Sequence, residues 1–206
     1  MSSGGWVVAI FLAVQPAGAA KLKITVQVHN AAHAPQSELR NALGQANFIL
    51  GQAGIKAQWL DCGNSVRDGV GLPGCQALTE TGLFVVSIVS EDPRGSGSSD
   101  VLGFAVLAGR GSGAAVVYSR IVSKLKDNPE YTECNLLGHV IAHELGHLLL
   151  RSPHHGEGIM KADWNREDFA AMRQRRLKFS LAEARRLESM PLSQTASAKI
   201  PAARTD

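Results

Sequence analysis

Alternating apolar and polar residues predict that the first part of the chain contains strands around one amphipathic helix. Residues 23–28 alternate between the two classes with the period of two that a half-buried strand requires. In residues 36–53, apolar side chains recur at helical spacing and form one stripe, which Gly54 then ends. Residues 55–60 are predicted to form a second strand.

The middle of the chain predicts three more strands and a short helix. The continuous apolar run at residues 83–89 indicates a central strand that is buried on both faces. Residues 91–100 combine proline, glycines and serines, which is typical of an exposed turn. Two further strands are predicted at residues 101–107 and 114–118, and a short helix at residues 119–126.

The last third of the chain is predicted to be helical. The segment at residues 133–150 carries apolar residues on both sides of a few polar ones and is predicted to form one buried helix. Asn165 begins a capping pattern for another helix, and residues 180–183 form a capping box for a helix that runs to about residue 190. The small and polar residues 191–206 predict a disordered tail.

Length and composition indicate one compact domain, which we assign to residues 21–190. The 206 residues are 45% hydrophobic, which is enough apolar material for a substantial core. The formal net charge is only +3, and the basic residues at 173–186 are interspersed with acidic ones. This mixture is typical of a solvated helix face, so we expect no nucleic-acid partner and a monomeric protein.

The N-terminus has the features of an export signal. Residues 6–14 are an apolar run of nine, and the small residues 17–20 after it suit cleavage following Ala19 or Ala20. Residues 1–20 are therefore predicted to be a signal peptide. Nine apolar residues are too few to span a bilayer, so we expect no stable membrane insertion. The expected location is extracellular or periplasmic.

Two cysteines fit such an oxidising compartment. Cys62 and Cys75 flank a segment rich in Gly, Asn, Asp and Pro, which cannot hold itself together by burial. A disulfide between them would stabilise the fold by roughly 3 kcal/mol, chiefly by restricting the unfolded chain. Cys134 is left over and is expected to be a small buried residue.

The strongest candidate for chemistry is the segment His-Glu-Leu-Gly-His at residues 143–147. His143 and His147 lie one turn apart on the same helical face, so both imidazoles can reach one metal ion. Glu144 then projects beside the metal and can take a proton from a water molecule bound to it. His139 is one turn earlier, and a packed histidine near the site is the favoured interpretation. Gly146 inside the helix indicates close backbone packing.

Residues 143–160, HELGHLLLRSPHHGEGIM, resemble the metzincin class of zinc metallopeptidases. In that class the active-site helix ends sharply, a third histidine follows, and a methionine-containing turn lies beneath the metal. The chain departs from the pattern in two places, because Leu150 replaces the usual glycine and Pro153 the usual third histidine. His154 comes one residue late and His155 two, so His154 is the favoured third ligand and His155 the alternative. Met160 would support the site structurally.

The missing glycine bears on how the helix ends. A left-handed backbone conformation costs glycine little, whereas arginine or leucine adopts it at a cost of roughly 1 kcal/mol. The extra residue before His154 is therefore expected to give a wider turn that avoids this strain.

The resemblance implies a zincin-like α/β (α+β) fold. It would contain a mixed, twisted sheet of about five strands with a long backing helix, an active-site helix and a C-terminal helix. In such domains a peptide lies antiparallel along the strand that borders the cleft. Residues 101–107 are the candidate edge strand, in which Gly103 could allow close backbone approach.

These inferences lead to a secreted zinc-dependent endopeptidase that acts on a peptide or protein substrate. One Zn²⁺ would be held by His143, His147 and His154, and Glu144 would be the general base for a zinc-activated water. The alternatives are a non-catalytic exported zinc-binding module and an exported adaptor in which the motif is coincidental. An intact Glu144 argues against the module, because a structural zinc site needs no base.

Overall fold

The computed structural model describes residues 22–64, 75, 83–94, 101–108, 111–128 and 135–189. The predicted signal peptide at residues 1–20, the predicted tail at 191–206 and Cys134 lie outside these ranges. None of the described helices is both long enough and apolar enough to cross a membrane.

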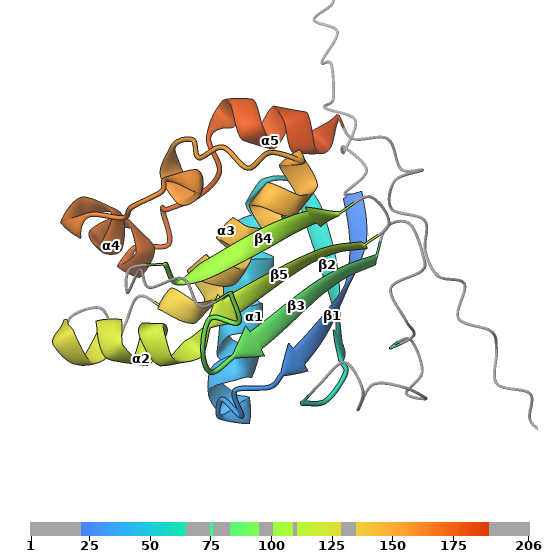
Figure 1. Ribbon diagram of the computed structural model, residues 1–206. Coiled ribbons are helices and arrows are strands. Elements are labelled where there is room, and N and C mark those ends of the chain that lie inside the picture. The colour runs from blue at the N-terminus through green and yellow to red at the C-terminus, as the bar shows by residue number, and fades with distance from the viewer. Residues whose placement is uncertain are drawn as a thin grey trace, which may run out of the picture.

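Five strands form one mixed sheet in the order β2-β1-β3-β5-β4. Four of them are parallel to one another, and β4 runs antiparallel to β5 at the edge. Figure 1 shows the twist of the sheet and the position of β4. The strands are β1 (Leu22–Asn30), β2 (Ile55–Asp61), β3 (Leu83–Val89), β4 (Gly103–Ala108) and β5 (Gly111–Val117).

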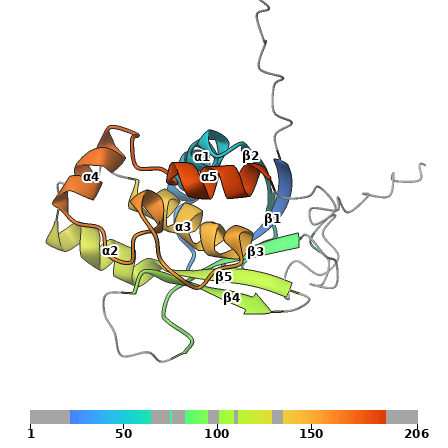
Figure 2. The same ribbon diagram turned by 90° about the horizontal axis from the view of Figure 1, so that it is seen from above.

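The two longest helices, α1 (Gln36–Gln52) and α3 (Leu136–Leu150), pack against each other and cover one face of the sheet. Figure 2 shows this layer of helices above the strands. The predicted apolar stripe of α1 forms part of the core between the layers, with Ala42, Ala46 and Ile49 fully buried. The helix ends before Gly54, which has the positive φ of 74° that favours glycine.

Three shorter helices and one 3₁₀ turn complete the described structure. Helix α2 (Tyr118–Asp127) follows β5 directly, and the 3₁₀ turn at Gly158–Met160 lies against α3. Helices α4 (Arg166–Arg173) and α5 (Leu181–Glu188) begin with the capping boxes predicted at Asn165 and Ser180. Figure 2 shows that both lie on the same side of the strands as α1 and α3.

The predicted fold class is confirmed, with some changes at the ends of elements. β3 has the predicted bounds, whereas α3 begins at Leu136 rather than at residue 133. Asn135 explains this start, because its side chain accepts a hydrogen bond from the Gly138 amide and caps the helix. The predicted disulfide joins Cys62 to Cys75, with their Cα atoms 5.6 Å apart.

Candidate metal centre and cleft

Helix α3 is mostly apolar, and every residue except its last is buried. Its buried polar residues include His143, Glu144 and His147. His143 and His147 are 7% and 6% exposed, and Glu144 is 4% exposed. Burying a polar side chain without a partner is unfavourable, so the contacts that these three side chains make define the site.

Backbone carbonyl groups fix the orientation of both imidazoles. His143 Nδ1 lies 2.7 Å from the Ile159 carbonyl oxygen, and His147 Nδ1 lies 2.7 Å from the Ser152 carbonyl oxygen. A carbonyl oxygen only accepts hydrogen bonds, so each Nδ1 carries a hydrogen and donates it. Burial lowers the pKa of His143 to about 4 and also lowers the pKa of His147, so both rings are neutral at pH 7.

The remaining ring nitrogens fit a metal ion. With Nδ1 protonated on both rings, each Nε2 has only a lone pair, yet the two Nε2 atoms face each other 3.0 Å apart. They cannot form a hydrogen bond in this state, whereas a cation between them would satisfy both. Two nitrogens bound to a tetrahedral zinc at about 2.0–2.1 Å are about 3.3 Å apart, close to the separation seen here.

His155 completes a group of three histidines with His143 and His147. One ring nitrogen from each residue lies within 4.8 Å of the other two. The His155 ring centroid is 5.4 Å from that of His143 and 4.9 Å from that of His147. Three imidazoles are a ligand set that zinc prefers, so the cluster fits a single zinc ion.

Met160 packs closely against Gly146 of α3. Met160 is buried, and a Cβ added at Gly146 would clash with its sulfur atom. Such a Cβ would also lie 2.8 Å from a ring carbon of Phe179. The close backbone packing predicted for Gly146 is therefore confirmed, and the turn before Met160 supplies the carbonyl that orients His143.

The side chain of Glu144 extends from α3 to the edge strand β4. A Cβ added at Gly103 would be 2.7 Å from Glu144 Oε1 and 3.0 Å from Glu144 Cγ, so only glycine leaves room for this side chain. Burial raises the pKa of Glu144 to about 8, and the positive charge of Arg94 opposes that rise. A dication bound by the neighbouring histidines would lower this pKa further.

A cleft of about 750 Å³ opens over these residues. One wall is β4, from Gly103 to Leu107, and α3 contributes His143, Glu144 and His147. The opposite side includes His155 and Trp164. The side chain of Trp164 meets the His143 ring edge-on, with centroids 5.6 Å apart. The predicted edge strand therefore borders the cleft that contains the three histidines and the buried carboxylate.

One solved structure with a similar fold is a zinc-dependent peptidase. The crystal structure of a zinc-dependent peptidase from Methanocorpusculum labreanum (strain Z) matches with a TM-score of 0.53 at 12% identity. The match covers 79% of this chain and 99% of that one. The fold is therefore similar to that of a zinc-dependent peptidase.

An archaemetzincin from Methanopyrus kandleri matches with a TM-score of 0.47 at 16% identity, covering 85% of this chain and 97% of the other. No protein-family model matches the sequence. No curated protein matches it either.

The group of three histidines contains His155, the predicted alternative third ligand, and does not include His154, the favoured one. The reason lies in how the chain leaves α3. Arg151 adopts a left-handed conformation, with φ 50° and ψ 44°, so the expectation of a wider turn that avoids this conformation is wrong. This turn brings the Ser152 carbonyl against His147, a hydrogen bond that offsets the strain. His154 is exposed, and its amide donates to the Ser152 hydroxyl.

His139 does not belong to the cluster. It is fully buried, its Nδ1 lies 3.1 Å from the Asn135 carbonyl oxygen, and its ring meets Trp164 edge-on. The predicted packed histidine is therefore confirmed.

Two cleft residues, Trp164 and Arg94, were not among the residues that the sequence patterns predicted for the site. Trp164 lies just before the capping pattern of α4, and Arg94 lies in a segment that was predicted only as an exposed turn. Neither residue belongs to a motif with fixed spacing. No local signal in the sequence could therefore have assigned them to the cleft.

Proposed function

We propose that this protein is a secreted zinc-dependent endopeptidase in which Glu144 acts as the general base. The observation that carries the proposal is the pair of Nε2 atoms of His143 and His147, which face each other 3.0 Å apart beside a buried carboxylate. Neither a packed core nor a solvated helix face requires two lone pairs to point at each other. The similarity of the fold to that of a zinc-dependent peptidase supports the same function.

His143, His147 and His155 would hold the zinc ion. When bound, zinc polarises a peptide carbonyl and lowers the pKa of a bound water molecule to near 7. The two Nδ1 hydrogen bonds, to Ile159 and Ser152, hold the rings so that the Nε2 lone pairs converge without further rearrangement.

Glu144 would move the proton. Its carboxylate takes a proton from the attacking water and delivers it to the nitrogen of the leaving amine. Burial raises the pKa of Glu144 to about 8, which favours the protonated form that exists between the two transfers. Arg94 and the metal charge favour the ionised form that must be present at the start of the reaction.

The substrate would bind as an added strand along β4. Among the described strands, β4 pairs only with β5, so its outer edge has backbone groups that a peptide can use. Val106 and Leu107 of this strand are 51% and 41% exposed, and they offer apolar contacts to side chains of a bound peptide. An extended substrate in this position would pass Gly103, which is adjacent to Glu144.

Export is also part of the proposal. The disulfide between Cys62 and Cys75 suits an oxidising compartment, in keeping with the signal peptide predicted at residues 1–20. Mass spectrometry of the secreted protein tests this directly, because cleavage after Ala19 or Ala20 would fix its N-terminus. A protein that stays in the cytosol with its N-terminus intact would contradict it.

Glu144→Gln tests the catalytic proposal. We expect this variant to bind zinc as the wild type does but to lose at least about 10²-fold in hydrolysis of a quenched peptide, because the general base is gone. A chelator should abolish wild-type hydrolysis, and added zinc should restore it. If the wild type binds zinc but cleaves neither casein nor quenched peptides, the alternative of a non-catalytic zinc-binding module is favoured.

The third ligand is tested by the zinc content of matched variants. His155→Ala should lose most of its bound zinc at low free zinc concentration, because only two ligands remain. His154→Ala removes an exposed histidine next to it and should keep one zinc per chain. The opposite result would identify His154 as the third zinc ligand.

A further inference from the structure

Arg94 projects from the segment after β3 and lines the cleft close to the candidate metal centre. Its guanidinium group stacks on the ring of Phe104, with the central carbon 3.7 Å from the ring centroid. Phe104 follows Gly103, the residue that abuts Glu144. Arg94 therefore lies beside the part of β4 that borders Glu144, and its positive charge acts on that carboxylate.

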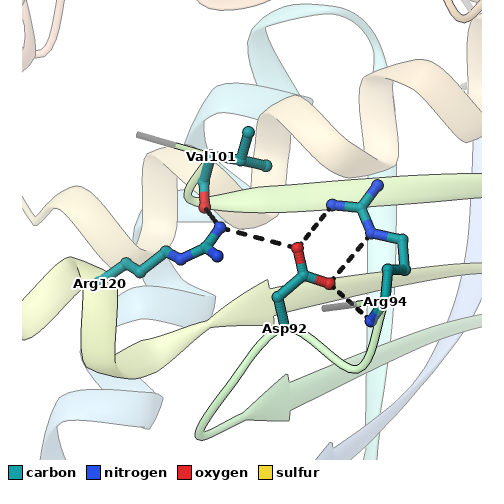
Figure 3. A network of polar contacts seen from close by, with 4 residues as sticks. All are labelled: Asp92, Arg94, Val101 and Arg120. Atoms are coloured by element: carbon teal, nitrogen blue, oxygen red, sulfur yellow. Dashed lines mark hydrogen bonds and ion pairs between the residues drawn. The ribbon is translucent and has the colours of Figure 1, made fainter. Parts of the chain in front are cut away.

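Asp92 holds this guanidinium group in place. Its two carboxylate oxygens accept hydrogen bonds from Arg94 Nε and Nη2, both 3.0 Å long, and the Asp92 side chain is only 2% exposed. Arg120 Nη1 lies 3.7 Å from the same carboxylate and donates to the Val101 carbonyl oxygen at 2.6 Å. Figure 3 shows Asp92 between the two guanidinium groups, so both the orientation and the position of Arg94 are fixed.

The third guanidinium nitrogen of Arg94, Nη1, is available to bind a ligand. Nη1 has no hydrogen-bond partner among the residues that the structure describes, and the Arg94 side chain is 45% exposed. Lys124 of α2 adds a second positive charge to the cleft lining, and the described residues form no ion pair with it. A positioned guanidinium group with a free N–H suits a carboxylate better than any neutral group.

We propose that Arg94 forms a carboxylate-binding subsite, so that the protein favours peptides with a carboxylate within one or two residues of the scissile bond. This inference rests on the proposed peptidase function and specifies its substrate class. Arg94 acts here as a specificity-determining residue. The carboxylate can belong to an internal Asp or Glu or to the C-terminus of a short peptide, and each source has its own substrate pair.

The test compares peptides that differ only in a carboxylate. One pair carries Glu or Gln at a single position near the cleaved bond, with both C-termini amidated, and the other ends in a free or an amidated C-terminus. For zinc-loaded wild type we expect kcat/KM to be about fivefold higher for the carboxylate member of at least one pair. The preference should weaken at high salt, because Arg94 is half-exposed.

Substitutions at Arg94 should change this ratio. Arg94→Gln should bring it close to one, and Arg94→Glu should invert it and favour a peptide with Lys at the same position. Arg40→Gln is the matched control, since Arg40 is exposed on α1 and does not line the cleft. Because both peptides of a pair are measured on one preparation, a partly unfolded variant does not alter the ratio.

Equal cleavage of both members of every pair by wild type would overturn the inference, and so would an unchanged ratio in Arg94→Gln. If no peptide is cleaved at all, the proposed function fails instead. Binding of the same peptides to the zinc-loaded Glu144→Gln variant, measured by fluorescence anisotropy, still tests the subsite in that case. Weaker binding of the amide member supports the subsite, and equal binding contradicts it.

Discussion

Gly103→Ala should disable the site while leaving the fold intact. The added methyl group would lie 2.7 Å from Glu144 Oε1, whereas ordinary contacts begin at about 3.4 Å. It would also lie 3.0 Å from the Ala115 carbonyl oxygen, so it is confined on two sides. Either the carboxylate or β4 must therefore move by about 0.7 Å.

This shift sets the size of the expected effect. Displacing a catalytic group by about 1 Å can lower a rate by about 10²-fold, so we expect kcat/KM to fall by roughly 30- to 100-fold. The cost in folding stability should be moderate, about 1–3 kcal/mol, because one strained contact is introduced at the edge of the sheet. Zinc content should not change, since the three atoms nearest to the new methyl group belong to Glu144 and Ala115 and not to a histidine.

The assay combines hydrolysis of a quenched peptide with zinc analysis and urea unfolding on the same preparation. Gly113→Ala is the matched control on the neighbouring strand, because its added Cβ would meet Val85 atoms only at 3.7 and 4.0 Å. This control should keep wild-type activity within about twofold. If Gly103→Ala were as active as Gly113→Ala, the position of the Glu144 carboxylate between α3 and β4 could not matter for the reaction.

Other predictions concern stability. Gly146→Ala should lower the free energy of unfolding by about 1–2 kcal/mol. The new methyl group would gain up to about 1 kcal/mol in helix propensity, but its clash with Met160 costs more. A variant that is more stable than wild type in urea unfolding would be evidence against this packing. Burial and the hydrogen bond to Glu38 raise the pKa of Tyr118 from 10.0 to about 12. The resulting stability is fully present below pH 10 and is lost as the pH rises towards 12, so Tyr118→Phe should lose less stability than wild type between pH 9 and 11. Cys62→Ser should cost roughly 3 kcal/mol under oxidising conditions and almost nothing relative to reduced wild type.

Much of this architecture could be predicted because it depends on local patterns. The bounds of β3 follow from one run that is apolar except for Ser87, and the start of α5 follows from the pairing of Ser180 with Glu183. The positions of His143 and His147 need only the helical repeat, since residues four apart share a face of α3.

The residues that could not be predicted depend on contacts between distant parts of the chain. Sequence spacing favoured His154, but the left-handed turn at Arg151 sets the direction of the chain, and this turn brings His155 to the cluster. The contact of Arg94 with Phe104 likewise depends on how the segment after β3 folds back against β4. Sequence patterns give no information on such a path when no motif marks it.

The histidine cluster also joins two separate parts of the backbone. His143 and His147 belong to a rigid helix, whereas His155 belongs to the irregular segment that follows it. An ion shared by all three would be an inorganic cross-link that closes a short loop, in the way that a covalent bridge closes a longer one. Removing the ion with a chelator would then remove this cross-link as well as the catalytic metal. The resistance of residues 151–157 to proteases should therefore increase when the metal is bound and decrease when it is removed.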